Sequence, residues 1–564
     1  MPKQPRMAYS PITNIIRKVL DVGANSHQQG TPLKEALEMH DEQAATLAKQ
    51  QKQLALESQD RRAFLQKTGV AAAVAAVSTS GVLSSRSAMA QGGPPSSGVK
   101  VAVVGAGLAG LRCAHRLNQL GSGFDVTVYE ASTRLGGRCY TARGYFDDGQ
   151  ITEWGGEFIN TDQTEIRNLA NKLGLTLDDE LASPPDGKQW MGYVDGQYYT
   201  ESQINNDWDI ELILTLNNAL KAAPNPGQVT YENYNAEHLR LDNMLAADWM
   251  DEIGLGRNSS IGRLMLGLGV SELGVDPDQQ SALNMLGIMS SKPHPAPERF
   301  RIRGGADQLI TGMEQELPAG SVITDKALTA IQGSANGPYT LSFNDGSSAV
   351  CDALVLALPF TTLRDVDIAP AIWNAFRPQK RQAINELGMG HNAKVQVQCN
   401  SRTWHNPITA NGELITPNGN TLTDPDSHIV SWDPTSNQAG SKGVLANYLG
   451  GSKGINLSST QPFQVSHAND INNFLNSIEN VFPGTAAAFN GKALTSAWEI
   501  NPWSKGSYSS FWQGQYTAFG GAAAKQEGNI FFAGEHTDNK DHGYLNGAVR
   551  SGERAAIEVL HTFY

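Results

Sequence analysis

The stretch between residues 99 and 130 constrains the fold of this chain more than any other feature. A short β-branched run over 99–104 passes directly into three glycines with the spacing G-x-G-x-x-G, namely Gly105, Gly107 and Gly110. A helical pattern follows, and a second apolar run over 125–129 ends in Glu130. Such glycines let the backbone approach a pyrophosphate at a helix N-terminus, and the acid can bind ribose hydroxyls. The sequence therefore predicts an α/β, Rossmann-like dinucleotide-binding domain.

Length and charge limit what else the chain can be. Its 564 residues exceed what one hydrophobic core supports, so we expect at least two domains. The 56 acidic residues outnumber the 43 basic ones and give a net charge of −13, which argues against nucleic acid as a partner. The four cysteines form no CxxC pair and the twelve histidines show no ligand spacing, so we expect core cysteines and no metal site.

The N-terminal part reads as a targeting segment rather than as part of the fold. Residues 1–60 form a polar extension, and residues 61–98 hold Arg61-Arg62, a modest apolar stretch and Ala88-Met89-Ala90 before a Gly/Pro/Ser linker. An arginine pair, an apolar stretch and an A-x-A end are typical of a twin-arginine signal. We therefore expect export by the twin-arginine machinery to the periplasm or beyond. The apolar stretch is too short for a stable membrane span.

Two glycine segments after Glu130 favour FAD over a nicotinamide cofactor. Glu130 is followed by Leu135 and then by Gly136, Gly137 and Arg138, and a second pair, Gly155 and Gly156, comes after a short strand-like stretch. These segments resemble the flavin amine oxidase family, which includes monoamine oxidases and L-amino-acid oxidases. The resemblance implies that Arg138 and both glycine pairs contact the flavin and its phosphates.

The C-terminal end is similar to the same family. A strand-like run ends in Gly534 and Glu535, and Gly543-Tyr544-Leu545-Asn546-Gly547 opens a helix. The resemblance implies that Gly534 and Glu535 lie near the ribityl and phosphate groups. It also implies that the helix start at Tyr544 and Leu545 points at the pyrimidine end of the flavin. Covalently flavinylated relatives have cysteine where this chain has Ser507, so we expect noncovalent FAD.

The resemblance covers the mature chain and predicts a two-domain amine oxidase fold. The FAD-binding domain would be discontinuous and occupy residues 98–178, 296–366 and 495–564. A mixed α+β substrate-binding domain would occupy residues 179–295 and 367–494, with helices at Glu211–Lys221 and Leu241–Ile253. By family position, Leu328 would contact the adenine.

Three residues carry the catalytic prediction. Family members keep a lysine that binds a water next to flavin N5, and Lys394 matches it. Its ammonium would position this water and assist reoxidation of the flavin by oxygen. Tyr508 and Tyr544 match two aromatic positions that flank the substrate amine, where rings exclude water and attract cations.

The substrate is less strongly indicated. Animal-type L-amino-acid oxidases carry Met-Arg, which clamps the carboxylate, where this chain has Glu157 and Phe158. Arg299 or Arg301 would have to replace that clamp. Glu157, if it faces the pocket, could pair with a cationic substrate terminus, and the segment that begins at Trp498 resembles one wall of the amine pocket.

We expect an exported FAD oxidase that deaminates an L-amino acid, with arginine or lysine favoured, to a 2-oxo acid, ammonia and hydrogen peroxide. The alternative is a monoamine or polyamine oxidase that yields an aldehyde. A carotenoid desaturase or isomerase shares the glycine motif but would lack the tyrosine pair. A catalytically silent FAD-carrying protein would not need Lys394 or the tyrosines. The oligomeric state stays open, and a homodimer is one option.

Overall fold

The computed structural model describes residues 98–120, 123–180, 188–200, 210–290 and 298–564, and isolated positions before 98 and between 200 and 210. The twin-arginine segment therefore lies outside the described residues. Within the described part of the chain, no helix is long and apolar enough to cross a membrane.

A parallel sheet of five strands forms the predicted Rossmann-like unit. Its order is β10-β2-β1-β14-β23, and every neighbouring pair is parallel. The strands are β1 (Lys100–Val104), β2 (Asp125–Tyr129), β10 (Val322–Ile323), β14 (Ala353–Leu356) and β23 (Ile530–Phe532). The strand interiors are apolar and β-branched, as in sheets covered on both faces. Segments far apart in sequence thus meet in one sheet, as a discontinuous domain requires.

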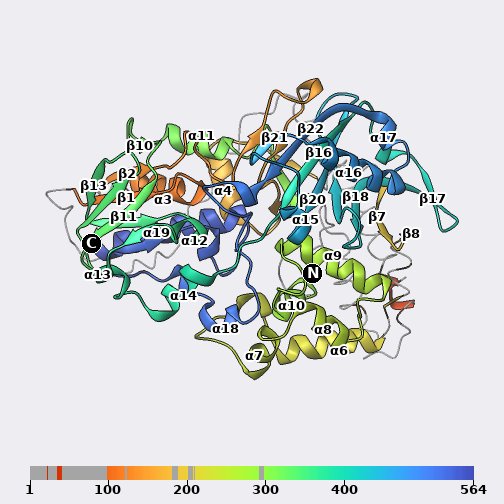
Figure 1. Ribbon diagram of the computed structural model, residues 1–564, viewed down its shortest axis with the longest axis horizontal. Helices are drawn as coiled ribbons and strands as arrows, with labels where there is room; N and C mark the ends of the chain where they lie inside the picture. The colour runs from red at the N-terminus through yellow and green to blue at the C-terminus, as the bar shows by residue number, and fades with distance from the viewer. Residues whose placement is uncertain are drawn as a thin grey trace, which may run out of the picture.

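Two helices pack against each other beside this sheet. Helix α3 (Leu108–Gln119) follows the first glycine turn, and α19 (Leu545–Phe563) ends the chain. The two lie together near β1 and β2 in Figure 1. Smaller elements complete this half of the molecule: α4 (Thr164–Lys172), α11 (Gln308–Gln315), α12 (Phe360–Leu363), α13 (Pro370–Trp373), α14 (Pro378–Glu386), and a sheet of β13 (Ser348–Cys351), β12 (Tyr339–Phe343), β11 (Leu328–Gly333) and β15 (Asp367–Ile368).

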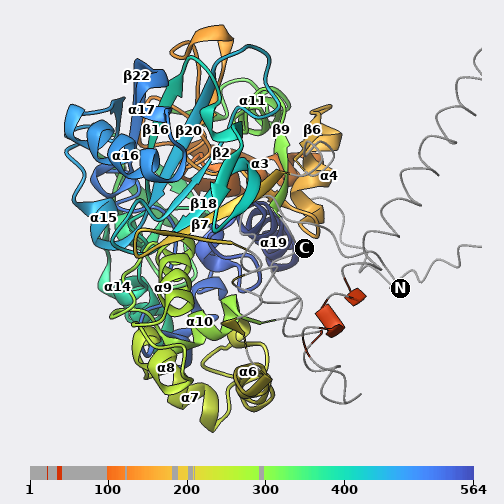
Figure 2. The same ribbon diagram turned by 90° about the vertical axis from the view of Figure 1, so that its right-hand side faces the viewer.

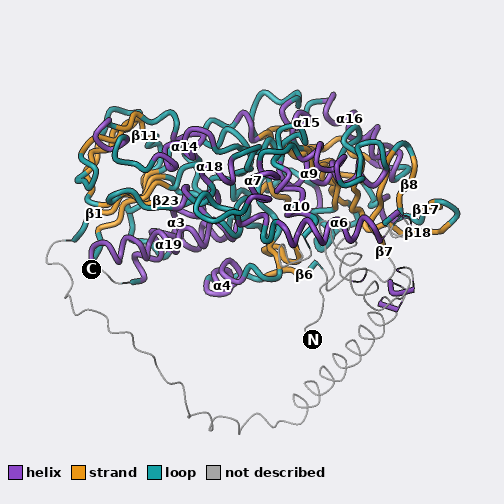
Figure 3. The backbone as a smooth tube through the Cα atoms, turned by 90° about the horizontal axis from the view of Figure 1, so that it is seen from below, coloured by secondary structure: helices purple, strands orange, loops and turns teal. Residues whose placement is uncertain are grey.

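A larger mixed sheet forms the other half. Its path runs β21-β22-β16-β20-β19-β18-β7-β8, with β17 paired to β18. The strands are β7 (Lys188–Val194), β8 (Gln197–Tyr199), β16 (Ala393–Cys399), β17 (Ile408–Ala410), β18 (Glu413–Thr423), β19 (Val430–Trp432), β20 (Gly443–Leu449), β21 (Phe463–Val465) and β22 (Phe489–Ala497). Helices α15 (Gly451–Ile455), α16 (Ala468–Val481) and α17 (Thr485–Ala488) lie beside this sheet in Figure 2. Figure 3 shows this sheet and the parallel sheet at opposite ends of the long axis.

A helical group lies between the two sheets along one side. It contains α6 (Ile210–Ala222), α7 (Ala236–Asp242), α8 (Ala246–Glu252), α9 (Ser260–Leu273), α10 (Ala282–Ile288) and α18 (Gln515–Phe519). The prediction of a single helix over Leu241–Ile253 is wrong. Helix α7 ends at Asp242 with Asn243 as its C-cap, and the backbone is extended at Leu245 before α8 begins. The helix expected at Glu211–Lys221 lies within α6.

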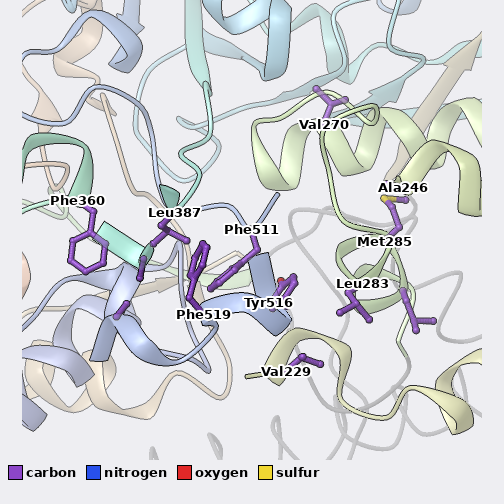
Figure 4. Close-up of a cluster of buried hydrophobic side chains, with 14 of the residues drawn as sticks. Val229, Ala246, Val270, Leu283, Met285, Phe360, Leu387, Phe511, Tyr516 and Phe519 are labelled. Carbon is purple, nitrogen blue, oxygen red and sulfur yellow. The ribbon is translucent and has the colours of Figure 1, made fainter. Parts of the chain in front are cut away.

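Aromatic rings of residues 511–519 pack together beside this helical group, and Asn284 of α10 is hydrogen-bonded to this segment. Phe511 stacks on Tyr516 with ring centroids 4.3 Å apart, and Phe519 lies beside them. Figure 4 shows these rings with Leu387 on one side. All belong to one buried cluster that also reaches the parallel sheet. The two halves therefore share a continuous core, which fixes the walls of the cavity between them.

Three short strands also contribute to that cavity. In this sheet β9 (Glu298–Ile302) pairs antiparallel with β5 (Ile159–Asn160) and with β6 (Leu177–Asp179). The pair β3 (Thr141–Ala142) and β4 (Thr152–Glu153) precedes it in sequence. This arrangement brings the segment after Gly156 next to the chain entering at residue 298.

Candidate active site

One cavity of about 940 Å³ runs between the glycine turns and the mixed sheet. Such a volume is near the upper end of the range for small-molecule sites, so it can hold a dinucleotide together with a small substrate. With one exception, every residue predicted for the site lines this cavity. These residues are Gly105, Gly107, Glu130, Gly136, Gly137, Arg138, Gly155, Gly156, Glu157, Phe158, Leu328, Lys394, Trp498, Tyr508, Gly534, Glu535, Tyr544 and Leu545.

The exception is Gly110, which was predicted to bind the cofactor. It does not line the cavity; a Cβ there would lie 1.9 Å from the carbonyl oxygen of Gly105 and 3.1 Å from the Cβ of Ala357. Gly110 is therefore needed for close packing of α3 on the glycine turn. Gly107 is different, because a Cβ at that position would meet no atom within 4 Å. The open space in front of Gly107 is where a pyrophosphate can approach the backbone.

The acid at the end of β2 is held rigidly. One oxygen of Glu130 accepts from the Ala106 amide at 2.7 Å, and the other accepts from the amide and the hydroxyl of Ser132 at 3.0 Å. The carboxylate is 7% exposed and lines the cavity, as does Leu328. These residues fit the adenosine part of FAD, since an ionised carboxylate keeps lone pairs for ribose hydroxyls.

A partly buried ion pair connects the glycine segment before Arg138 with the C-terminal segment at Gly534 and Glu535. Arg138 donates to Glu535 at 2.7 Å and to the Ser507 carbonyl oxygen at 3.0 Å. Glu535 also accepts from the Ser509 hydroxyl and the Gly543 amide, each at 2.7 Å. Burial opposes ionisation of Glu535, but Arg138 and its other partners outweigh it and lower its pKa to about 2. The charge of Arg138 is therefore largely compensated before any phosphate approaches.

The N-terminus of α19 opens on the same cavity. Its N-cap is Tyr544, and no side chain caps the first turn. The first amides of a helix have no partner inside the helix and carry partial positive charge. Leu545 and Ala548 from this turn line the cavity. A negatively charged part of a flavin fits this position.

Lys394 lies near the start of β16 and is buried. Its ammonium donates to the carbonyl oxygens of Glu153 at 3.2 Å and Gly155 at 2.9 Å, and to the carboxylate of Glu157 at 3.0 Å. A lysine ammonium has three N–H donors, so protein groups occupy all of them here. The water-mediated role expected from the family resemblance stays a prediction.

Glu157 lines the cavity, but other cations already neutralise it. Besides Lys394, it accepts from the Trp432 indole at 3.2 Å and lies 3.4 Å from the Nε of Arg301. Burial raises the pKa of Glu157, and the two cations more than reverse this effect. Its expected pairing with a substrate cation is therefore not supported, because the charge is used inside the protein.

The two arginines considered for a carboxylate clamp are also engaged. Arg299 forms an ion pair with Asp179, with nitrogen and oxygen 2.5 Å apart. Arg301 lies between Glu157 and Glu180, and its guanidinium carbon is 4.5 Å from the centre of the Phe158 ring. Neither lines the cavity. Among the described cavity-lining residues, the cations are Arg134, Arg138, Lys394 and the exposed Lys540.

The tyrosine pair is accompanied by a third tyrosine. The Tyr508 hydroxyl donates to the carbonyl oxygen of Glu272 at 2.9 Å and accepts from the Tyr448 hydroxyl at 3.1 Å. Burial raises the pKa of Tyr508 well above its ordinary value, and nearby Tyr448 and Tyr544 add to this. Both predicted tyrosines line one cavity, and Tyr508 is held there as a neutral ring.

Aromatic side chains form much of the remaining wall. The Phe158 and Trp432 ring centroids are 5.8 Å apart, and those of Trp432 and Tyr448 are 5.5 Å apart. Trp498 packs edge-on against Phe463 at 4.8 Å, and its indole donates to the Trp154 carbonyl oxygen. These rings give the cavity an apolar wall near Lys394.

Sequence reasoning missed several polar or aromatic residues of this cavity: Asn160, Glu272, Glu298, Trp432 and Tyr448. None belongs to a motif, and they come from five separate parts of the chain. The only sequence signal among them is that Asn160 follows the segment Gly155–Ile159. No group of three or more metal-ligating side chains is found among the described residues.

The fold and the cavity together define a flavin-dependent oxidoreductase. The family model of flavin containing amine oxidoreductases matches residues 108–560, and the chain belongs to this family. The L-amino acid dehydrogenase of Synechocystis sp. is 25% identical over 508 residues, covering 83% of this chain and 96% of that protein. The L-amino-acid oxidase of Vipera ammodytes ammodytes is 25% identical over 81% of this chain and 92% of its own length.

Solved structures agree on the fold. Cyclohexylamine oxidase from Brevibacterium oxydans superposes with a TM-score of 0.69 at 22% identity, covering 83% of this chain and 99% of that one. Putrescine oxidase bound to putrescine gives a TM-score of 0.67 at 20% identity, covering 82% and 99%. The predicted two-domain amine oxidase fold is confirmed. The enzyme is a FAD-dependent amine or amino-acid oxidase, and the residues that line the cavity would hold a flavin, which would supply two-electron oxidation of an amine.

Proposed function

We propose that this enzyme oxidatively deaminates an L-amino acid with a basic side chain, such as arginine or lysine, to a 2-oxo acid, ammonia and hydrogen peroxide. One observation carries the proposal. Lys394, Tyr508 and Tyr544 line the same cavity as the glycine turns, and carboxyl groups lie at the substrate end of that cavity. An amine can therefore reach the flavin between neutral aromatic rings, while carboxyl groups favour a second positive charge.

The names of the relatives support amino acids as one of two substrate classes. The Synechocystis and Vipera proteins are named for L-amino acids, and a further relative from Pseudomonas putida is a nicotine dehydrogenase. Because the identity is only about 25%, these names indicate the type of reaction better than they indicate the substrate. The acidic character of the cavity is what narrows the choice to cationic amines.

An amine without a carboxylate is the second candidate, and the arginines favour it. Arg299 is paired with Asp179, and Arg301 lies behind Glu157, outside the cavity lining. A buried carboxylate with no partner would cost several kcal/mol. A diamine such as putrescine avoids that cost and still uses the acidic end of the cavity.

The proposed reaction does not require a strong base among the described side chains. The substrate amine enters deprotonated, and the tyrosine rings with the aromatic wall hold it and exclude water. The pair of Lys394 and Glu157 fixes the loop at Gly155, which lines the cavity. Positioning of the amine and its α-carbon is then the main contribution of the protein.

A peroxide-coupled screen of the twenty L-amino acids beside putrescine, spermidine and benzylamine tests the proposal. We expect turnover with L-arginine or L-lysine well above that with their D-isomers or benzylamine. Turnover of putrescine or spermidine alone would establish the second candidate. Activity mainly on large apolar amino acids would refute the cationic preference.

We also propose that the folded holoprotein is exported by the twin-arginine route. The support is Arg61-Arg62 with the apolar stretch and the A-x-A site after it. FAD is inserted in the cytoplasm, so the cargo must cross the membrane folded. Replacement of both arginines by lysine should retain active enzyme in the cytoplasm, and unimpaired export of that variant would refute the proposal.

A further inference from the structure

We propose that Asn160 and Glu298, with Glu272 nearby, form a subsite that binds the distal cationic group of the substrate. The inference rests on the proposed function, in which the substrate carries a second positive charge beyond the reacting amine. This subsite takes the role that the sequence suggested for Glu157, because the carboxylate of Glu157 already pairs with Lys394 and Arg301.

The strand register brings Asn160 and Glu298 together. Asn160 ends β5, Glu298 begins β9, and the two residues are opposite each other in an antiparallel pair. The register shifts between Ile159 and Asn160, so this pair lies at a strand irregularity of the kind that re-aims side chains beside functional sites. Both residues line the cavity. A ligand at this point can therefore contact both side chains at once.

These two side chains hold polar atoms whose hydrogen bonds are not made within the protein. Asn160 is 1% exposed, and both its Oδ1 and its Nδ2 are buried without a hydrogen-bond partner. The Oε2 of Glu298 is also buried without one. Most buried polar atoms in proteins are hydrogen-bonded, and leaving one unpaired costs about 1–3 kcal/mol. Three such atoms on neighbouring positions of a cavity wall indicate a place where a ligand completes the bonds.

The chemistry of the free atoms specifies the ligand. Oδ1 of Asn160 and Oε2 of Glu298 are acceptors that N–H donors of a ligand can satisfy, while Nδ2 of Asn160 is a donor that needs an acceptor on the ligand or on a neighbouring carboxyl group. A guanidinium offers five donors in a planar fork, and an ammonium offers three. Glu272 adds negative potential, since it is one of the groups that disfavour ionisation of Glu298. A cation with several N–H groups matches this site better than a neutral alcohol or an anion.

Binding of a cation should release a proton. Burial raises the pKa of Glu298 well above its ordinary value, and Glu272 and Glu157 add to this while Arg301 and Lys394 oppose it. Without ligand the neutral carboxylic acid form is therefore favoured more strongly than in an exposed glutamate. When a cation enters, the O–H bond of the carboxylic acid breaks, the proton leaves to the buffer, and the carboxylate pairs with the cation. Net charge in the subsite is thereby conserved.

The first test measures binding without turnover. Butylguanidinium has the distal cation but no α-amine, and calorimetry can follow its binding to the oxidised holoenzyme. We expect Glu298→Gln to weaken its affinity about 10- to 100-fold, because a hydrogen bond to a charged group is lost. Asn160→Ala should weaken it less. The exposed Glu413→Gln on β18 is a matched control for net charge, and its affinity should equal that of the parent.

The same titrations count the released proton. In two buffers of different ionisation enthalpy at pH 7, binding of butylguanidinium should release protons in the parent, and Glu298→Gln should release none. Equal affinity in the parent, Glu298→Gln and Asn160→Ala would overturn the subsite. So would proton release that persists in Glu298→Gln.

Turnover separates this inference from the proposed function. Citrulline is a neutral analogue of arginine, and norleucine is lysine without its distal ammonium. Glu298→Gln should raise the KM for arginine while leaving that for citrulline nearly unchanged. If arginine is oxidised and its KM does not respond to Glu298→Gln, the subsite is wrong and the function stands. If putrescine alone is oxidised and its KM does respond, the subsite stands and the amino-acid proposal is wrong.

Discussion

The two ends of the cavity are built in opposite ways. At the dinucleotide end, Glu130 and Glu535 have their oxygens satisfied by neighbouring amides, hydroxyls and Arg138. At the substrate end, Asn160 and Glu298 keep buried polar atoms without partners. The first end is complete before the cofactor arrives, and the second leaves bonds for the substrate to make. We therefore expect the satisfied carboxylates to hold the cofactor end rigid, and the unpaired polar atoms to select the substrate.

The largest effect on stability is expected from a substitution at the dinucleotide end of the cavity. Glu535→Gln leaves Arg138, whose side chain is 22% exposed, without its countercharge, and loss of one member of a buried ion pair costs at most about 3–5 kcal/mol. We expect the free energy of unfolding to fall by up to this amount in denaturant titrations. The exposed pair of Glu232 and Lys525 is the control, and Glu232→Gln should change stability by less than about 1 kcal/mol. Equal losses in both variants would contradict the rigid cofactor end.

The same carboxylate should make stability depend on acid pH. Its pKa is lowered from 4.5 to about 2 in the folded protein. A lowered carboxylate pKa stabilises the fold above the unfolded value, and this stabilisation is lost as the pH falls from about 4.5 toward 2. Melting temperatures measured across this window should decline more steeply in the parent than in Glu535→Gln. Parallel curves would show that Glu535 is not the group responsible.

Substitutions at two glycines should distinguish a role in helix packing from a role in cofactor binding. Gly110→Ala places a Cβ 1.9 Å from a backbone oxygen that cannot move aside, so we expect about 3 kcal/mol of destabilisation even without FAD. Gly107→Ala meets no protein atom within 4 Å, so the apoprotein should keep its stability and FAD affinity should fall. Thermal melts of the apoprotein and FAD titrations distinguish the two. If Gly107→Ala destabilised the apoprotein as much as Gly110→Ala, the open space at Gly107 would be wrongly assigned.

Two substitutions at the substrate end should affect different half-reactions, one the reduction of the flavin and the other its reoxidation. Tyr508→Ala removes one ring beside the amine and should slow anaerobic flavin reduction on the order of 100-fold, because a small misplacement of the reacting atoms has this effect. Lys394→Met should leave reduction closer to the parental rate and slow reoxidation by oxygen. Stopped-flow absorbance follows each step separately. Parental reoxidation in Lys394→Met would refute the role taken from the family resemblance.

The smallest effect is expected at Ser507, where covalently flavinylated relatives have cysteine. Its hydroxyl donates to the Asn392 side chain at 2.8 Å and accepts from the Asn392 amide at 3.1 Å. Ser507→Ala should cost about 1 kcal/mol of stability. Acid precipitation should release free FAD from both the parent and the variant. Flavin that stays with the precipitated polypeptide would contradict noncovalent binding.

The same contrast explains what the sequence could predict. Strand, glycine turn and acid are adjacent in the chain, so Gly105, Gly107 and Glu130 could be assigned from spacing alone. Gly110 belongs to the same motif but serves helix packing, which spacing cannot distinguish from ligand contact. Asn160 and Glu298 are 138 residues apart and meet only through strand register. No local pattern carries such a pairing.

Glu157 shows a different limit. The sequence predicted a carboxylate beside the pocket, and Glu157 lines the cavity, but its charge state depends on Lys394 and Arg301, which come from β16 and β9. Buried carboxylates change their role with their partners. The break between α7 and α8 is similar, since tertiary contacts around Leu245 overrode a helical pattern.

Anaerobic reduction of the bound flavin tests the central claim most directly. The oxidised holoenzyme is mixed with L-arginine or with citrulline without oxygen, and bleaching of the flavin absorbance is followed in the parent and in Glu298→Gln. The account predicts rapid bleaching of the parent by arginine, much slower bleaching by citrulline, and loss of most of this difference in Glu298→Gln. Equal bleaching by arginine and citrulline in the parent, or no bleaching by any amine, would contradict it.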